Sequence, residues 1–404
     1  MASKTFNADD IFHFEELISR EDRMIMDAAR EYAQTKLEPR ALEGNQDEVF
    51  DIEIAREMGD LGFLGVFLPD TYDCAGAGYT AYGVINRELD RVDSAYRSFV
   101  SDQSSLVMYP IYAFGTEEQR QKYLPRLATG ELIGCYGLTE PDHGSDPGSM
   151  LTSAKKVAGG WKMNGSKMWI TNSPIADLCV VWAKAYDGSD EDGVIRGFLL
   201  EKGMEGLSTP KINNKMSMRA SPTGEIVMQD VFVPDENVFP DIRGLKGPFS
   251  CLNNARFGIV WGVTGVAENC YHRAREYVLG RTQFGYPLAS MQLIQTKLAN
   301  MVTTITQMQL LAWRLADLKE QDRATPEMIS LAKRNNAGAA LNIARDARDM
   351  LGGNGITGDF RVIHHMMNME TVNTYEGTYD IHGLVIGRAI TGIQSFVPRG
   401  NDLS

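Results

Sequence analysis

Cysteine is scarce in this chain of 404 residues, and no two cysteines form a CxxC pair. The five are Cys74, Cys135, Cys179, Cys251 and Cys270. This odd, scattered set argues against a disulfide framework and a zinc site, and it favours a reducing compartment. The adjacent His364 and His365 point apart and do not form a metal pair on their own. We therefore expect no metal.

Long apolar runs and an excess of positive charge are also missing. No segment approaches 18 consecutive apolar residues, so no membrane span is predicted. The chain has 40 Lys+Arg against 53 Asp+Glu, a net charge of −13. This balance argues against a nucleic-acid protein, because phosphate binding needs a concentrated basic surface. The N-terminus is acidic and has neither an apolar signal core nor a transit-peptide pattern, so we expect a bacterial cytoplasmic protein, or a mitochondrial matrix protein in mature form.

The pattern of apolar residues changes twice along the chain. Residues 18–128 repeat apolar side chains at intervals of three and four, which predicts helices. Residues 134–240 hold short strand-like runs, among them two predicted strands about an Asn164-Gly165 turn. Longer helical patterns return from residue 249, and one of these helices is predicted to begin at Pro326 with Thr325 as its N-cap.

These changes predict an α+β protein with several domains. The length suggests two or three domains, and 43% hydrophobic residues suffice for a large core. We predict a helical domain over 1–133, a β-barrel or sandwich over 134–244, and an antiparallel helical bundle over 245–404.

A polar face is predicted on the helix over residues 81–106. Asp90, Ser94, Arg97 and Ser101 follow i, i+4, i+7 and i+11, so they share one side. Such a face is usually solvated. The alternative is that Arg97 and its hydroxyl neighbours bind a carboxylate, which fits a guanidinium well.

Three other segments could hold a ligand or a cofactor. Residues 134–150 form a loop rich in Gly, Ser, Asp and Pro, in which Thr139, Ser145 and backbone amides are free to bind, although a surface turn is an equal alternative. Trp169 and Thr171 alternate onto one strand face and could meet a flat ligand, or form a half-buried aromatic strand. The glycines of 349–356 allow close approach of a phosphate, or simply cap a helix. No GxGxxG follows a strand, so a Rossmann site has no support.

Glu376 is the candidate general base. It lies in NTYEGTYDIH, with aromatic residues on both sides. A carboxylate in an apolar pocket has its pKa raised toward neutrality, which suits proton abstraction. The alternative is an exposed loop acid, the common situation for glutamate.

Taken together, these segments resemble the acyl-CoA dehydrogenase family. The family's order and spacing are matched by CYGLTEPDHGSDPGSM, WITN, GRTQFG, ARDMLGGNGI and TYEGTYDIH. The resemblance covers the whole chain and implies an N-terminal helical domain, a middle β-domain and a C-terminal four-helix bundle. It also implies a homotetramer with one FAD per subunit.

The resemblance assigns residues to FAD and to the substrate. FAD would lie against Tyr136, Leu138, Thr139, Gly144, Ser145, Trp169, Ile170 and Thr171, with Thr378 and Asp380 beside the base. A neighbouring subunit would contribute Arg281, Phe284, Gln292, Asp349, Met350, Leu351, Gly352 and Gly353. The acyl-CoA would pass Ser145, Leu252, Asn253, Asn254, Arg256, Tyr375 and Gly377.

The resemblance also implies a reaction. Glu376 would remove the α-proton of an acyl thioester while hydrogen bonds stabilise the enolate and the β-hydride leaves for the flavin. RELDRVDSAYRS and VNTYEGTYDIHGLVIGRAITGIQ are similar to the glutaryl-CoA dehydrogenases, which convert glutaryl-CoA to crotonyl-CoA and CO2 in lysine and tryptophan degradation. Arg97 and Ser98, with Ser101 close by, then match the positions that contact the distal carboxylate. Asp90 stands where close relatives have Glu, one methylene longer.

Alternatives to this function remain open. The chain could oxidise a straight-chain or branched acyl-CoA, or stop at glutaconyl-CoA. It could also be a non-catalytic family member retained as a binding protein, against which the presence of Glu376 counts. Acyl-CoA oxidases pass electrons to O2 but are usually longer, so 404 residues favour a dehydrogenase that passes electrons to an electron-transferring flavoprotein.

Overall fold

The computed structural model describes residues 6–188 and 193–395. Residues 1–5 and 396–404, the outer ends of the first and third predicted domains, lie outside this part. The N-terminal segment is helical, as its apolar periodicity predicts. Its helices are α1 (Arg20–Tyr32), α2 (Glu38–Asp47), α3 (Glu53–Asp60), α4 (Gly78–Val92), α5 (Ser94–Ser101), α6 (Tyr109–Phe114) and α7 (Glu117–Ala128).

A seven-stranded sheet follows within the described residues. Its strands are β1 (Gly134–Gly137), β2 (Ser153–Val157), β3 (Gly160–Thr171), β4 (Leu178–Tyr186), β5 (Val194–Glu201), β6 (Leu207–Ser208) and β7 (Thr223–Pro234). The order is β1-β4-β2-β3-β7-β6, with β5 paired to β4. The first half of β4 pairs in parallel with β1 and its second half with β2, while β5 runs antiparallel along it.

The turn predicted at Asn164-Gly165 is wrong, because β3 runs straight through these residues. Its pairing with β7 shifts register between Met163 and Gly165, so the glycine supplies a bulge (φ 140°) instead of a hairpin. The Asn164 amide exchanges two 2.9 Å hydrogen bonds with Asp230 across that bulge. The actual turn lies just before β3, at Gly159 (φ 75°).

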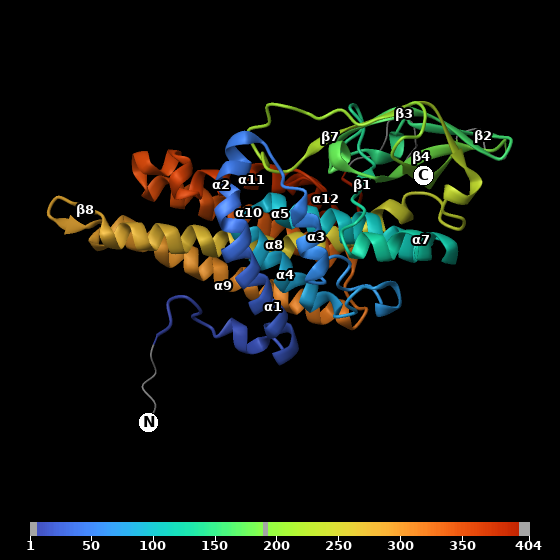
Figure 1. The fold of residues 1–404 in the computed structure, drawn as a ribbon. Coiled ribbons are helices and arrows are strands. Elements are labelled where there is room, and N and C mark those ends of the chain that lie inside the picture. The colour runs from blue at the N-terminus through green and yellow to red at the C-terminus, as the bar shows by residue number, and fades with distance from the viewer. Residues whose placement is uncertain (1–5, 189–192, 396–404) are drawn as a thin grey trace.

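The C-terminal segment is a bundle of longer helices. These are α8 (Lys246–Gly280), α9 (Gln292–Glu320), α10 (Pro326–Met350), α11 (Val362–Val372) and α12 (Tyr379–Thr391). The predicted start at Pro326 is confirmed: the Thr325 hydroxyl accepts a hydrogen bond from the Met328 backbone N–H at 3.4 Å. A small hairpin, β8 (Thr282–Gln283) and β9 (Tyr286–Pro287), projects from the end of α8 remote from the sheet (Figure 1).

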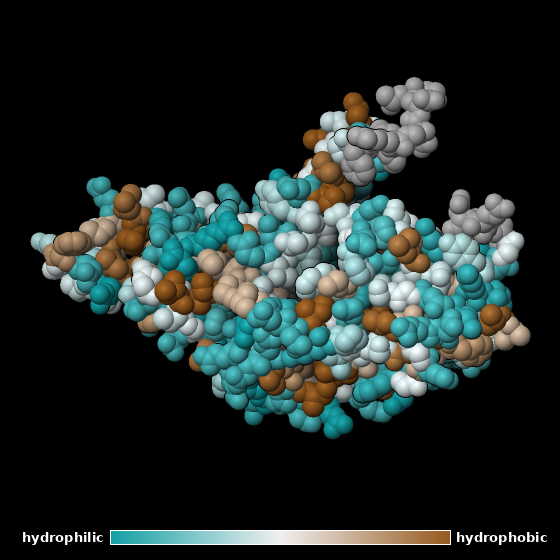
Figure 2. All heavy atoms as spheres, turned by 90° about the horizontal axis from the view of Figure 1, so that it is seen from above, coloured by the Kyte–Doolittle hydropathy of each residue, from teal (hydrophilic) through white to brown (hydrophobic). Residues whose placement is uncertain are grey.

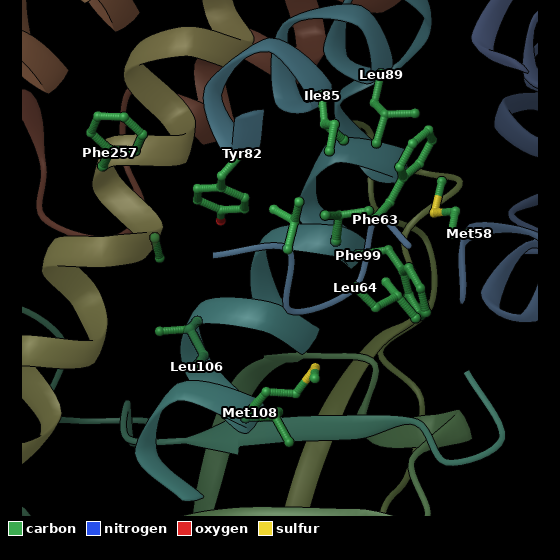
Figure 3. Packing of buried hydrophobic residues seen from close by; sticks show 14 of the residues in the cluster. Met58, Phe63, Leu64, Tyr82, Ile85, Leu89, Phe99, Leu106, Met108 and Phe257 are labelled. Atoms are coloured by element: carbon green, nitrogen blue, oxygen red, sulfur yellow. The ribbon is translucent and has the colours of Figure 1, made fainter. Parts of the chain in front are cut away.

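The largest hydrophobic cluster joins all three segments. Tyr82 of α4 lies near Phe257 of α8, with ring centroids 6.3 Å apart, and Leu106 and Met108 continue the cluster toward the sheet (Figure 3). Trp182 of β4 belongs to the same cluster. The helical segments and one side of the sheet therefore share a core.

Close packing of α4 against α8 depends on Gly83. A Cβ there would lie 2.6 Å from the Trp261 indole, so Gly83→Ala must displace the ring. We expect the substitution to lower the free energy of unfolding by about 1–3 kcal/mol, as overpacking does. Thermal unfolding measures this. Gly387→Ala in α12 is the control, because nothing lies within 4 Å of its new Cβ. Equal melting temperatures of the two variants would contradict the packing argument.

The surface seen from above is largely hydrophilic, with small and separate apolar patches (Figure 2). Among residues 6–188 and 193–395, no helix combines the length and the hydropathy that crossing a membrane requires.

Candidate active site

The predicted helix over residues 81–106 is interrupted in the structure. α4 ends at Val92, Asp93 is extended (φ −160°, ψ 136°), and α5 begins at Ser94. The Asp93 side chain accepts a hydrogen bond from the Ala95 backbone N–H at 2.9 Å, which caps α5 and explains the interruption.

The predicted polar face of this segment is not solvated. Both α4 and α5 pack against α8, which covers them. All four members of that face, Asp90, Ser94, Arg97 and Ser101, are buried, and so is the neighbouring Ser98. Burying a charge is costly unless it is paired, so the partners of Arg97 and Asp90 decide what this face does.

Arg97 and Asp90 form an ion pair with no exposed surface. Arg97 Nε donates to Asp90 Oδ2 at 3.0 Å, and its Nη2 donates to the Tyr375 hydroxyl. Burial lowers the pKa of Arg97, but Tyr375 and Asp90 outweigh it, so that pKa stands above its usual range and the guanidinium is charged. Gly262 of α8 leaves room for the pair, since a Cβ there would lie 2.4 Å from Asp90 Oδ2.

One side of this pair is unsatisfied. Arg97 Nη1 and Asp90 Oδ1 are buried and have no hydrogen-bond partner among the described residues. A buried, charged donor without an acceptor favours an anionic ligand at this position, which fits the alternative interpretation of the polar face.

Glu376 lies in the loop between α11 and α12, beside Arg97. Its backbone is left-handed (φ 53°), and its Oε2 is buried without a partner. Burial raises the pKa of the Glu376 carboxyl, while Arg97, Arg256 and Lys333 partly offset the rise. The environment is that of a general base rather than of an exposed loop acid.

Arg256 connects the start of α8 to the Glu376 loop. Its Nε donates to the Glu376 carbonyl oxygen at 2.7 Å, and its Nη1 donates to Asn253 Oδ1 at 3.3 Å. Asn254 accepts a hydrogen bond from the Tyr79 hydroxyl at 3.3 Å, and Leu252 packs at the edge of the core. The expected substrate residues of α8 thus lie on the first turns of that helix, beside the candidate base.

Lys333 was not predicted as a site residue from its sequence context. It is fully buried on α10, and its Nζ donates to the carbonyl oxygens of Tyr375 and Gly377. A signal was present: Ile329, Ala332, Asn336 and Ala337 form the buried stripe of α10, and a lysine on that stripe needs a polar partner inside.

The two expected flavin segments of the β-domain lie side by side. The Met168 backbone N–H donates to the Thr139 carbonyl at 2.9 Å, which joins the loop after β1 to β3. Trp169 is left-handed (φ 63°) and is 57% exposed as a residue. The register shift here interrupts the alternation from which a common face with Thr171 was predicted. Gly144 and Ser145 are exposed, and a Cβ at Gly144 would meet nothing within 4 Å.

These observations fit a flat cofactor such as FAD, because an exposed indole and an open glycine-containing loop meet at one edge of the sheet. The side chains of Tyr136, Leu138 and Ile170 are buried, and the Tyr136 hydroxyl donates to the Pro248 carbonyl at 3.2 Å. These three residues expose little surface, so the open part of this edge comes from Trp169 and from the loop with Gly144 and Ser145.

The other expected flavin residues lie far away in the same chain. They lie at the opposite end of the bundle. The exposed ones are Arg281, Phe284, Gln292, Asp349, Gly352 and Gly353, and the buried ones are Met350 and Leu351. α8 connects Arg256 to Arg281, about 37 Å at roughly 1.5 Å per residue. Within one subunit, the β8–β9 hairpin that follows Arg281 lies at the end of the bundle remote from the sheet (Figure 1).

Thr378 and Asp380 lie just after the candidate base. The Thr378 hydroxyl caps α12 by accepting a hydrogen bond from the Ile381 backbone N–H at 3.1 Å, and Asp380 is exposed in the first turn. In residues 6–188 and 193–395, no three His, Cys, Asp or Glu side chains gather as a metal site would require.

Comparison with known proteins places these observations in one family. Sequence profiles of the acyl-CoA dehydrogenase N-terminal, middle and C-terminal domains match residues 19–131, 135–231 and 243–391. A glutaryl-CoA dehydrogenase from Mycobacterium smegmatis, solved in complex with FADH2, is 43% identical with a TM-score of 0.94, covering 97% of this chain and 100% of that one.

Relatives with another substrate are also similar. The butyryl-CoA dehydrogenase structure from Megasphaera elsdenii is 32% identical with a TM-score of 0.88, covering 92% of this chain and 98% of that one. A short-chain specific acyl-CoA dehydrogenase from Clostridium acetobutylicum is 34% identical over 92% of this chain and 98% of its own length. With all three domain profiles matched in order, the chain belongs to the acyl-CoA dehydrogenase family.

Proposed function

We propose that this chain is an FAD-dependent dehydrogenase that oxidises glutaryl-CoA and releases CO2 to give crotonyl-CoA. The observation that carries the proposal is the buried, charged Arg97, whose Nη1 lacks an acceptor next to Glu376. A distal carboxylate on the acyl chain supplies that acceptor. An apolar acyl chain leaves Arg97 Nη1 without one, at a cost in binding free energy.

The residues of the chain have separate tasks in this proposal. The Glu376 carboxylate takes the α-proton of the thioester, and burial keeps its pKa high enough for it to hold that proton. Arg97, with Ser98 and Ser101, holds the distal carboxylate and so fixes the α- and β-carbons along the acyl chain. FAD, when bound against the Trp169 edge, supplies the hydride acceptor.

Asp90 bears on the decarboxylation step. Its Oδ2 orients Arg97, and its own negative charge repels the carboxylate that Arg97 binds. We propose that this balance keeps the carboxylate bound during oxidation and still permits CO2 to leave.

The partners of the protein are also proposals. The separation of about 37 Å between Arg256 and Arg281 supports a site completed by a neighbouring subunit, as in a homotetramer. We propose an electron-transferring flavoprotein as the electron acceptor. The proposed location is a bacterial cytoplasm or, for a mature eukaryotic chain, the mitochondrial matrix.

A second candidate is a short-chain acyl-CoA dehydrogenase. The similarity to the Clostridium acetobutylicum and Megasphaera elsdenii proteins favours it. The two candidates differ in the group at the far end of the acyl chain, which is anionic in glutaryl-CoA and apolar in butyryl-CoA.

Anaerobic mixing of the oxidised holoenzyme with each thioester separates them. We expect glutaryl-CoA to bleach the flavin faster than butyryl-CoA does, because only its carboxylate pairs with Arg97. Mass spectrometry of the quenched mixture should find crotonyl-CoA and equimolar CO2. Accumulation of glutaconyl-CoA would show an enzyme that stops after oxidation, and preference for butyryl-CoA would support the second candidate.

A further inference from the structure

The loop that carries Glu376 is held by two cationic side chains from other elements. Lys333 Nζ donates to the carbonyl oxygens of Tyr375 at 2.9 Å and of Gly377 at 2.8 Å. Arg256 Nε donates to the carbonyl oxygen between them, that of Glu376, at 2.7 Å. Three consecutive carbonyl groups therefore point toward cations, which fixes the orientation of every peptide plane around the candidate base.

This backbone needs such support because two neighbouring residues are left-handed. Glu376 has φ 53° and Gly377 has φ 96°. A glutamate in this region is strained and persists only where its surroundings determine the conformation. A Cβ at Gly377 would lie 2.8 Å from His382 Nε2, so the loop also packs closely against α12.

Burying the charged ammonium group of Lys333 is energetically unfavourable. This lysine is fully buried, and no carboxylate oxygen of the described residues lies within salt-bridge distance of its Nζ. Burial lowers the pKa of Lys333, and the nearby Glu376 carboxylate opposes this by favouring the charged ammonium group. An apolar residue would fill the same stripe of α10 without this cost, so the lysine is explained by what its Nζ contacts.

We infer that Lys333 is a positioning residue for Glu376, holding the loop so that the carboxylate stays in the buried space it shares with Arg97 and Arg256. Its positive charge also favours the ionised form of the base. The inference rests on the proposed function, because it takes Glu376 as the group that accepts the substrate proton.

The hydrogen bonds of Lys333 and its positive charge should affect different kinetic quantities. The hydrogen bonds control geometry, and therefore the limiting rate of flavin reduction at high pH, where Glu376 is fully ionised. The charge controls the pH at which that rate is half-maximal. Other ionisable groups interact with Glu376 from the surrounding elements. They are Tyr375 in the loop, Tyr82 on α4, Arg97 on α5, Asp102 directly after α5, Tyr136 on β1, Arg256 on α8 and His382 on α12.

Two substitutions separate the contributions. Lys333→Met removes both donors and charge, whereas Lys333→Gln keeps an NH2 group that can donate to two carbonyls. In the holoenzyme, with whichever of glutaryl-CoA and butyryl-CoA reduces the wild-type flavin, we expect Lys333→Met to lower the high-pH rate about 10- to 100-fold. Lys333→Gln should stay within about 3-fold. Both should move the half-maximal pH upward, since a cation beside the base is lost.

Lys215 provides a matched control. Its Nζ also donates to two loop carbonyls, those of Met218 (2.9 Å) and Ser221 (2.8 Å), and Met218 is left-handed as Glu376 is. Lys215→Met should leave both the rate and the pH midpoint unchanged. Infrared difference spectroscopy of the carboxyl stretch, with Glu376→Gln as the blank, measures the pKa of Glu376 without turnover.

The outcomes decide the inference whether or not the methionine variant folds. A Lys333→Met rate equal to that of Lys215→Met overturns it, and so does a Lys333→Gln rate about 10-fold or more below wild type. If Lys333→Met does not retain FAD, the glutamine variant alone decides, through its rate and its infrared pKa. Normal turnover of Glu376→Gln would instead overturn the proposed function, so the two failures are distinguishable.

Discussion

Glu376→Gln is expected to bind FAD and acyl-CoA normally and to lose about 10²- to 10⁴-fold in the rate of flavin reduction, the range for removal of a general base. The amide is isosteric, so the left-handed backbone and its hydrogen bonds to Lys333 and Arg256 remain. What disappears is the only lone pair in the loop basic enough to take an α-proton. Stopped-flow absorbance of the flavin measures the loss.

The matched control is Glu370→Gln, which makes the same chemical change on an exposed residue that pairs with Arg345. Exposed ion pairs contribute little, and this variant should reduce its flavin at the wild-type rate. Near-normal reduction in Glu376→Gln would place the base elsewhere.

The second large effect is expected at Arg97, in specificity. Arg97→Met leaves the distal carboxylate of glutaryl-CoA desolvated and unpaired, which costs about 2–5 kcal/mol, or roughly 30- to 5,000-fold in kcat/KM. Activity with butyryl-CoA should fall much less, because its apolar chain needs no cation and the unpaired Asp90 that the substitution leaves affects both substrates alike. Steady-state kinetics with both thioesters on one preparation measures the ratio, and butyryl-CoA serves as the internal control for folding.

An equal loss with both substrates would falsify the glutaryl-CoA assignment, since Arg97 would then support the fold alone. The Asp90→Asn variant gives a further comparison, because its amide keeps an oxygen for Arg97 Nε but lacks the charge that repels the substrate.

The sequence predicted the order of helical and β segments well, because apolar periodicity reports which side of each element is buried. It failed where an element depends on a remote partner. Asn164-Gly165 is a typical hairpin pair, yet β7 lies along β3 and turns the glycine into a bulge. The residues around Asn164 and Gly165 carry no information about β7, because that strand comes later in the chain. At Asp93 a local feature was overlooked instead. The Asp93 side chain caps α5 and so interrupts the predicted helix, although the apolar stripe continues across the break.

The candidate site was predictable to different degrees. Asp90 and Arg97 were placed on one face from their spacing, and they do pair, although through two helices instead of one. That the face is buried could not be seen, since it follows from α8, which comes much later in the chain, at Lys246–Gly280. Lys333 was missed because a lysine in a helical sequence is ordinarily exposed, and only the carbonyls of a distant loop justify its burial.

The shared packing of α4, α5 and α8 limits how substrate preference can change in this protein. Asp90 and Arg97 belong to the N-terminal segment, but the residue that makes room for them, Gly262, belongs to α8, as does Trp261 against Gly83. Consider a chimera that takes only its N-terminal helices from a relative with a different substrate preference. Its α4 and α5 would no longer match Gly262 and Trp261 of α8. Specificity in this chain is thus inherited through two segments together, and neither is a transferable module.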